Sequence, residues 1–359
     1  MQQAHEILPG LPHVESPLFD QIVEELELTP VELQVAVDLH KRGYAVIDFP
    51  DEEINARIKR IKHRLASIFD IDLSNPEGRK TDGASLRVQD AWHSDEDVRA
   101  IAANNQILSL LTKIYGRKAF PFQTLNFPVG TQQHLHSDSI HFSSIPERFM
   151  CGVWLAMEDV HPDSGPLTYL PGSHKWPVLS NAMIGRRGYS TQSQYAQAPF
   201  ELAWRALVQA SGIKPEVFLA KKGQALIWAA NLLHGGSVQN DPTLTRWSQV
   251  SHYYFDDCTY YTPAFSDEPL GDLKLRDIVD VVTKEARPNL YLGEPVRSSR
   301  RASESFKNRI MNRIRRVTLP SDFDAATYYD LNPDVAASGV DAEVHYRKHG
   351  RSEGRPYRV

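Results

Sequence analysis

Helical and extended hydrophobic patterns alternate in the amino-terminal third of the chain. Residues 29–32, Thr-Pro-Val-Glu, have the form of a capping box with proline at the first helical position, and they predict a helix that ends near Gly43. A strand is expected at 44–49, followed by a helix from Asp51 in which apolar residues recur at steps of three and four. The basic residues of that helix predict a solvated face. Another helix is expected at 95–114.

The middle of the chain has the patterns of β-strands. Residues 133–142 have a period of two, so a strand there would send His134, His136 and Asp138 to one face. The mostly apolar run 225–236 predicts a buried strand that meets a turn at its glycines.

A further strand is expected at 246–255, following a turn at 239–242. Alternation places Arg246, Ser248 and Val250 on one of its faces. If that face looks into a barrel, the buried guanidinium of Arg246 requires an anionic partner, which a dicarboxylate cosubstrate would supply.

Three residues in these strands carry the candidate chemistry. His136 and Asp138, with His234 as a third ligand, would offer two imidazoles and one carboxylate, a set that suits non-haem Fe(II) and leaves coordination positions open. The His-x-Asp triplet alone is weak evidence, because a chain with 14 histidines and 45 acidic residues can contain one by chance. The strand context and Arg246 make the metal site the better interpretation.

Together these blocks resemble the phytanoyl-CoA dioxygenase family of Fe(II)- and 2-oxoglutarate-dependent oxygenases. His136 and Asp138 resemble the proximal ligand pair and His234 the distal ligand. Arg246, with Ser248 beside it, resembles the arginine that pairs with the distal carboxylate of 2-oxoglutarate. Residues 154–159 and 164–175 resemble the W-x-A-x-x-D strand and the G-x-L-x-x-x-P-G-S-H turn of the family, and 122–127 resembles a strand that places a glutamine near the cosubstrate.

The resemblance covers residues 43–254. It implies a mainly β fold with flanking helices, a double-stranded β-helix of the jelly-roll or cupin type, with Fe(II) as cofactor and 2-oxoglutarate and O2 as cosubstrates. Gln123 and Trp154 are then further candidate contacts of the cosubstrate. The implied reaction is hydroxylation of a small molecule with release of succinate and CO2. Asp138 fills the position that a halogenase of this architecture leaves open for halide.

Some features depart from the family. His134 and His141 flank the ligand pair, so one of them is a candidate substrate contact. No segment resembles a coenzyme A site, and a fatty acyl thioester is therefore not implied. Residues 81–92 are open to two interpretations, a lid over the site or a plain surface loop. The insertion 180–195, with two arginines, is where we expect specificity.

Composition argues against several other classes of protein. The net charge of −5 argues against a nucleic-acid binder, whose binding face would be basic. Cys151 and Cys258 are expected to be buried hydrophobes rather than a disulfide. The chain has no signal-peptide pattern and no run of about 18 apolar residues, so neither secretion nor a transmembrane helix is expected. These observations predict a cytoplasmic protein.

The carboxyl-terminal part is expected to be an appendage. We expect a jelly-roll domain with its N-terminal helices at 1–290, a basic linker helix at 291–319 and a small helical module at 320–359. Two interpretations of the linker helix remain open: contact with an anionic membrane surface or a partner protein, or docking through its apolar face. The module, Y-x-x-x-N-P-D-V-A-x-x-G followed by H-Y-x-x-x-G-x-x-E-G-R, resembles one found at the ends of bacterial proteins associated with cell-surface polysaccharide synthesis.

Two classes of function follow. The first is a dioxygenase acting on a small molecule, with a sugar or glycan-related compound suggested by the module. The second is a non-catalytic jelly-roll protein that binds or scaffolds in polysaccharide synthesis, since fold does not determine function. The full ligand set together with the arginine favours the enzyme.

Overall fold

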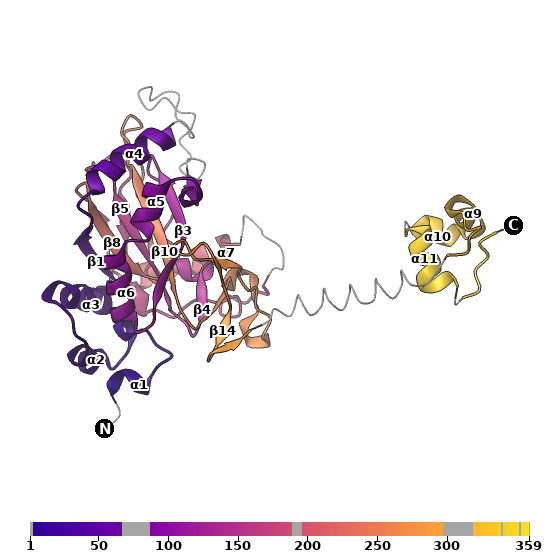
Figure 1. Ribbon diagram of the computed structural model, residues 1–359, viewed down its shortest axis with the longest axis horizontal. Helices are drawn as coiled ribbons and strands as arrows, with labels where there is room; N and C mark the ends of the chain where they lie inside the picture. Colours follow the sequence, from indigo (N-terminus) through magenta and orange to yellow (C-terminus); the bar gives the residue numbers. More distant parts are fainter. Residues whose placement is uncertain are drawn as a thin grey trace. The chain divides into compact units, whose positions relative to one another are not determined.

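The computed structural model describes residues 3–66, 87–188, 196–296, 319–338, 340–351 and 353–358. The chain divides into two compact units, Met1–Val296 and Arg297–Val359 (Figure 1). The first unit extends past the boundary expected at 290, because Leu290 begins a short hairpin and its backbone N–H donates to the carbonyl of Cys258.

A six-stranded antiparallel sheet forms the frame of the first unit. Its order is β1-β8-β5-β10-β3-β2, and every neighbouring pair is antiparallel. The strands are β1 (Tyr44–Asp48), β2 (Val88–Gln89), β3 (Ala119–Phe127), β5 (Met150–Ala156), β8 (Gln224–Ala229) and β10 (Ser248–Phe255).

A smaller sheet, in the order β7-β6-β9, faces the large one. Its strands are β6 (Leu167–Tyr169), β7 (Glu216–Phe218) and β9 (His234–Gly236). Trp154 and Trp228, from alternate positions of β5 and β8, share a buried cluster with Phe218 of the small sheet. Two antiparallel sheets packed over one apolar interior confirm the expected jelly-roll. Three short strand pairs are also described in this unit: β4 (Ser143–Ile145) with β11 (Thr259–Tyr261), β12 (Ile278–Val279) with β13 (Ala286–Arg287), and β14 (Leu290–Tyr291) with β15 (Glu294–Pro295).

Helices cover the other face of the large sheet (Figure 1). Val153 and Ile227, which alternate with the inner tryptophans, pack there against Leu39 and Ile58. The helices of this unit are α1 (Ala4–Ile7), α2 (Phe19–Glu25), α3 (Pro30–Arg42), α4 (Ile54–Ala66), α5 (Glu96–Ala102), α6 (Asn105–Tyr115) and α7 (Ala198–Ser211).

Two of the expected helices show how local signals decide boundaries. The capping box is present at α3, where Thr29 accepts from the N–H of Glu32 and Gly43 ends the helix at a φ of 84°. The single helix expected at 95–114 is wrong. It is divided into α5 and α6, because the Asn104 side chain accepts from the backbone N–H groups of Gln106 and Ile107 and starts a new helix.

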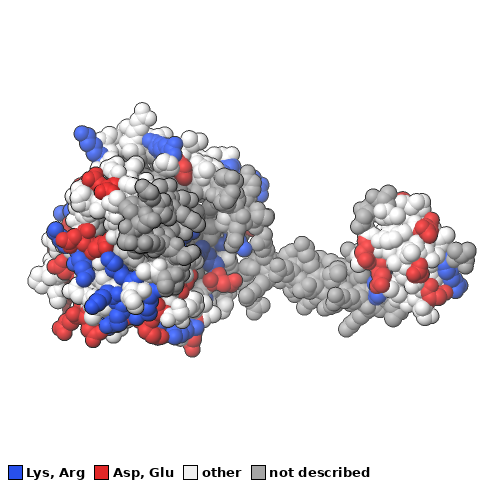
Figure 2. Space-filling view, turned by 90° about the horizontal axis from the view of Figure 1, so that it is seen from above, with Lys and Arg blue, Asp and Glu red and all other residues white. Residues whose placement is uncertain are grey.

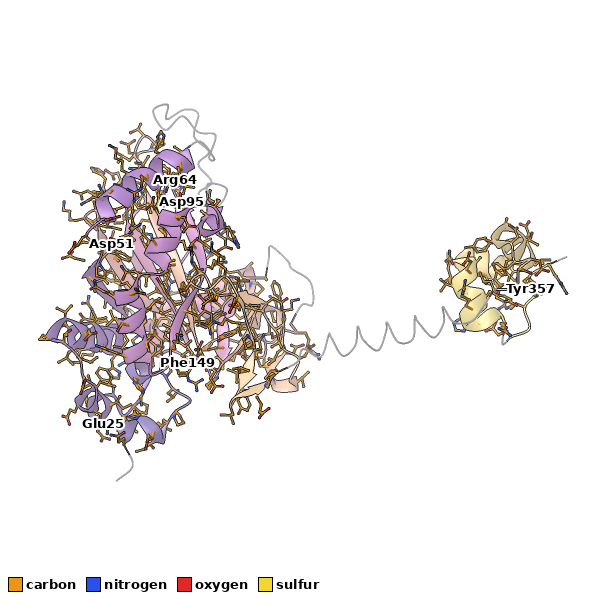
Figure 3. The ribbon with its side chains drawn as sticks, in the orientation of Figure 1. Glu25, Asp51, Arg64, Asp95, Phe149 and Tyr357 are labelled. Atoms are coloured by element: carbon orange, nitrogen blue, oxygen red, sulfur yellow. The ribbon has the colours of Figure 1, made fainter. Side chains whose placement is uncertain are left out.

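The basic side of α4 is largely exposed, as expected, but it also forms ion pairs that the sequence did not indicate. Arg60 and Arg64 donate to Asp97 at 2.6 Å, and Arg64 also donates to Asp95 at 2.7 Å (Figure 3). Hydrogen bonds from Arg60 and Arg64 outweigh burial and hold the pKa of Asp97 well below its usual range. Figure 2, seen from the side where α4 lies uppermost in Figure 1, shows basic and acidic side chains interspersed. The network fastens α4 to α5.

The second unit has a small core of its own. Its helices are α9 (Ala325–Leu331), α10 (Pro333–Ser338) and α11 (Ala342–His345), followed by a π-helical turn at Tyr346–Gly350. Tyr328, Val335, Ala342 and Tyr346 are buried together, and Tyr357 lies against them (Figure 3). A Cβ at Gly350 would lie 2.1 Å from the Tyr328 hydroxyl, so the glycine of the H-Y-x-x-x-G motif is a packing requirement. Most of the expected linker helix, 297–318, lies outside the described residues.

Candidate active site

The segment that carries His136 and Asp138 is not the strand predicted at 133–142. His136 makes one isolated bridge with His234, with backbone N–O distances of 2.9 Å in both directions. Asp138 then begins a 3-10 turn, Asp138–Ile140, because the Ser137 hydroxyl accepts from the N–H of Ser139 and caps it. The two ligand candidates therefore converge through a bridge and a turn rather than through alternation.

His234 begins a strand of the small sheet. The buried strand predicted within 225–236 is present as β8, but the turn comes earlier than expected, after Ala229, and the glycines belong to β9. A Cβ at Gly235 would lie 2.5 Å from the carbonyl oxygen of Gln133, closer than a side chain can tolerate. The glycines after His234 therefore let the backbone that carries His136 approach β9 closely.

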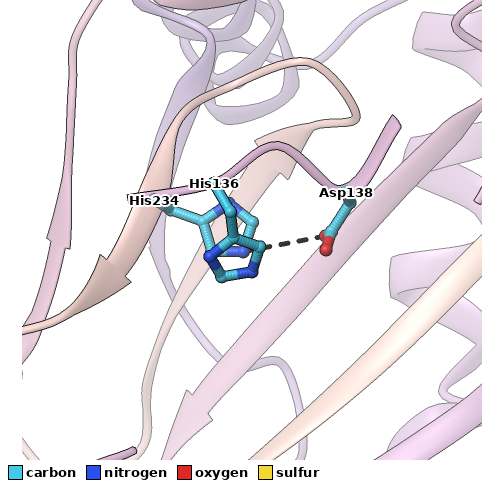
Figure 4. A group of neighbouring side chains, drawn as sticks. All are labelled: His136, Asp138 and His234. Atoms are coloured by element: carbon cyan, nitrogen blue, oxygen red, sulfur yellow. Dashed lines mark ion pairs between the residues drawn. The ribbon is translucent and has the colours of Figure 1, made fainter. Parts of the chain in front are cut away.

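His136, Asp138 and His234 form a compact buried group (Figure 4). The potential ligand atoms of the three side chains all lie within 4.8 Å of one another. The Nδ1 atoms of His136 and His234 lie 2.8 and 3.0 Å from the carbonyl oxygens of His134 and Leu232. Since a carbonyl only accepts, each Nδ1 carries the hydrogen, and each neutral ring keeps Nε2 unprotonated for a metal.

The protonation states also suit metal binding. Burial lowers the pKa of His136 to about 3, with the neighbouring His234 adding to the effect, so this imidazole is neutral at pH 7. Burial alone would raise the pKa of Asp138, but the nearby imidazoles of His234 and His252 outweigh it and hold that pKa far below its usual range. The donor set is thus two imidazoles that each present Nε2 and one carboxylate, which fits Fe(II).

Two residues that the sequence analysis missed hold Asp138 in place. The Trp228 indole N–H donates to Oδ2 of Asp138 at 2.9 Å, and Nε2 of His252 lies 3.6 Å from the same oxygen. His252 is itself hydrogen-bonded through Nδ1 to Gln123, at 3.0 Å. The signal was available: alternation along β10 and β8 places His252 and Trp228 on the inner face with Val250 and Leu226.

A cavity of about 710 Å³ opens beside the triad. Gln123, Trp154 and Arg246, the candidate contacts of a cosubstrate, line it. Ser248 is fully buried beside Arg246 in sequence but is not part of the cavity wall, although its hydroxyl has no hydrogen-bond partner.

Arg246 is a buried cation without an anionic partner among the described residues. Its side chain is 2% exposed, and its guanidinium lies 5.5 Å from the centre of the Trp154 ring. The Nε atom has no hydrogen-bond partner, and no ion pair joins Arg246 to any residue that the structure describes. Burial lowers its pKa to about 10, which still leaves it cationic at neutral pH. A bound carboxylate would compensate this charge.

Only some of the candidate substrate contacts line the cavity. His141 lines the cavity, and its Nε2 lies 3.0 Å from Oε1 of Gln197, whereas His134 is exposed and is not on the cavity wall. Arg87 and Gln89 of the expected lid line the cavity, and residues 81–86 lie outside the described residues, as do 189–195 of the insertion. Arg187, from the described part of that insertion, pairs with Asp267 instead.

Comparison with known proteins agrees with this geometry. The family model for phytanoyl-CoA dioxygenase (PhyH) matches residues 39–240, more than half of the chain. The ectoine dioxygenase of Stutzerimonas stutzeri (strain A1501) is 24% identical over 234 residues, which cover 61% of this chain and 76% of that protein.

Two solved structures from nogalamycin biosynthesis share the fold. The non-heme alpha ketoglutarate dependent carbocyclase SnoK has a TM-score of 0.51 at 17% identity, covering 72% of this chain and 95% of its own. The epimerase SnoN has a TM-score of 0.50 at 18% identity, covering 75% and 96%. At these identities the likeness establishes the fold.

Proposed function

The chain belongs to the phytanoyl-CoA dioxygenase family and is an Fe(II)- and 2-oxoglutarate-dependent dioxygenase, and we propose that it hydroxylates a small molecule at the centre formed by His136, Asp138 and His234. The observation that carries the proposal is the buried triad, in which both Nδ1 atoms face backbone carbonyls and Nε2 is left for a metal, beside an arginine that has no ion pair among the described residues. A scaffolding protein without turnover would need neither feature.

Each side chain has a task in this proposal. His136, Asp138 and His234 would hold Fe(II), and Trp228 and His252 would keep the Asp138 carboxylate oriented. Arg246 would bind the far carboxylate of 2-oxoglutarate. Trp154 would form the wall beside that carboxylate, and Gln123 would fix the His252 ring.

The overall reaction balances without a further reductant. Bound iron and 2-oxoglutarate supply the oxidation: O2 and 2-oxoglutarate become succinate and CO2, while one oxygen atom enters a substrate C–H bond to give C–OH. The protein provides orientation and an environment from which the inward-facing apolar cluster around Trp154 and Trp228 excludes water.

We further propose a sugar or glycan-related substrate, supported by the resemblance of the carboxyl-terminal module to those of polysaccharide-synthesis proteins. On this proposal the module brings the enzyme to a partner protein, a membrane surface or a glycan, and the enzyme works in the cytoplasm. Among the described residues no helix is long and apolar enough to cross a membrane.

Replacing the triad tests the proposed centre. We expect His136→Ala, Asp138→Ala and His234→Ala each to abolish succinate formation from 2-oxoglutarate and to weaken Fe(II) binding. His63→Ala is the matched control, because His63 is an exposed histidine of α4 outside the cavity. Full activity in any triad variant would remove that residue from the metal site, and a wild-type protein that never forms succinate would refute the proposed function.

A further inference from the structure

Besides Arg246, the cavity wall carries Arg276, an arginine that the proposed chemistry does not use. Arg276 lines the cavity and lies against aromatic rings, 4.7 Å from the centre of Phe142 and 5.9 Å from that of Phe122. One of its terminal nitrogens, Nη1, donates to the carbonyl of His141 at 3.2 Å and to the hydroxyl of Thr262 at 3.3 Å. The guanidinium is therefore held in a fixed orientation by neutral groups.

No carboxylate of the described residues forms an ion pair with Arg276. Its Nε atom is buried without a hydrogen-bond partner, as is that of Arg246. The described cavity wall carries four basic side chains, Arg87, Arg246, Lys274 and Arg276, and two acidic ones, Asp138 and Asp277. Since Asp138 faces the two imidazoles of the metal centre, the cavity keeps an excess of positive charge that favours an anionic ligand.

Strand β10 places the two arginines on opposite sides of the metal centre. On its inner face Val250 lies opposite Trp154, over which Arg246 lies. Two residues further along, His252 contacts Asp138, and after two more Tyr254 stacks on Phe122, the ring beside Arg276. Val250 and Tyr254 are about 13 Å apart along an extended strand. The Asp138 carboxylate therefore lies between the two cationic ends.

We propose that Arg276 binds a carboxylate or phosphate group of the small-molecule substrate. This inference rests on the proposed function and specifies its substrate class. The cosubstrate is a dicarboxylate that would use one end at Arg246 and the other at the metal, so it leaves Arg276 for a second anion. The substrate would extend from Arg276 toward Asp138 along the ring of Phe142, which lies 5.1 Å from that of His252. Uronic acids and sugar phosphates meet both this requirement and the glycan-related class.

The test measures succinate formation by the iron-loaded full-length enzyme with 2-oxoglutarate and a panel of small acids. Each acid is paired with a neutral counterpart: uronic acids with their amides and parent sugars, sugar phosphates with the free sugars, and amino acids with their amides. We expect at least one acid to stimulate succinate formation above the rate without substrate, while its neutral counterpart does not. Mass spectrometry of the stimulating acid should show the addition of one oxygen atom.

Variants connect the stimulation to Arg276. Arg276→Gln should raise the KM for the stimulating acid by about 10- to 100-fold, the cost of losing one charge-assisted contact, with the KM for 2-oxoglutarate nearly unchanged. Arg276→Lys keeps the charge but loses the planar pair of donors, so its KM for the acid should lie between those of the wild type and Arg276→Gln. Arg205→Gln is the matched control, because Arg205 lies on α7, pairs with Glu201 and is not on the cavity wall.

The possible failures are distinguishable. Equal stimulation by neutral counterparts, no stimulation by any acid, or an unchanged KM for the acid in Arg276→Gln would overturn the anionic-substrate proposal while leaving the dioxygenase assignment intact. Absence of succinate formation under every condition would instead count against the proposed function itself.

Discussion

Trp228→Phe should separate the orientation of the metal ligand from the packing of the barrel. The substitution keeps an aromatic ring in the buried cluster but removes the N–H that donates to Asp138 at 2.9 Å. A hydrogen bond to a charged group is worth about 1.5–3 kcal/mol, which corresponds to about a 10- to 100-fold loss of Fe(II) affinity. That range agrees with the usual effect of residues that orient metal ligands.

The assay is competition for Fe(II) with a chromophoric chelator under anaerobic conditions, beside urea unfolding of the metal-free protein. Trp204→Phe is the matched control: Trp204 is 3% exposed in a separate cluster on α7, where a smaller ring costs packing but touches no ligand. Both variants should lose about 1–2 kcal/mol of unfolding free energy. If Trp228→Phe binds iron like the control, the indole N–H does not orient Asp138.

Three further outcomes follow from other parts of the molecule. Arg246→Lys should raise the KM for 2-oxoglutarate about tenfold or more, because lysine lacks the planar pair of donors, and should leave Fe(II) affinity nearly unchanged; loss of iron instead would make Arg246 structural. Burial lowers the pKa of His174 to about 4 from an ordinary 6.5. The contribution of the neutral ring to the free energy of unfolding is therefore fully present above pH 6.5, and about 3 kcal/mol of it is lost as the pH falls to 4. Urea unfolding across that window should show a smaller pH slope in His174→Gln, and equal slopes would contradict the assignment. Truncation after Val296 should leave a soluble unit that still forms succinate, whereas an insoluble product would show that later residues complete its core.

The grouping of the candidate ligands could be predicted from sequence because it depends on residue chemistry and order along the chain. His136, Asp138 and His234 are the group that the fold brings together, and Arg246 lines the adjoining cavity. Alternation along β10 also placed Ser248 and Val250 together on its inner face, as the structure has them. His252 lies two residues beyond Val250, on the same face, and the same alternation applies to it.

The path of the backbone into the site could not be predicted in the same way. A period of two at 133–142 is equally compatible with a single bridge followed by a turn, and the segment is rich in Gln, His, Ser and Asp rather than β-branched residues. The ion pairs of α4 have a similar cause. Its basic residues are largely exposed as expected, but their partners Asp95 and Asp97 belong to another segment and cannot be inferred from the sequence of α4.

The order of side chains along β10 accounts for how one strand can organise the whole cavity. Arg246 precedes the strand, His252 contacts the candidate ligand Asp138 near its middle, and Tyr254 stacks on the ring beside Arg276. Because consecutive inward positions are about 6.6 Å apart, such a strand spaces a cosubstrate end, a metal and a substrate end at molecular distances. On the proposed function, changing the anion at the Arg276 end would therefore leave the Arg246 end undisturbed.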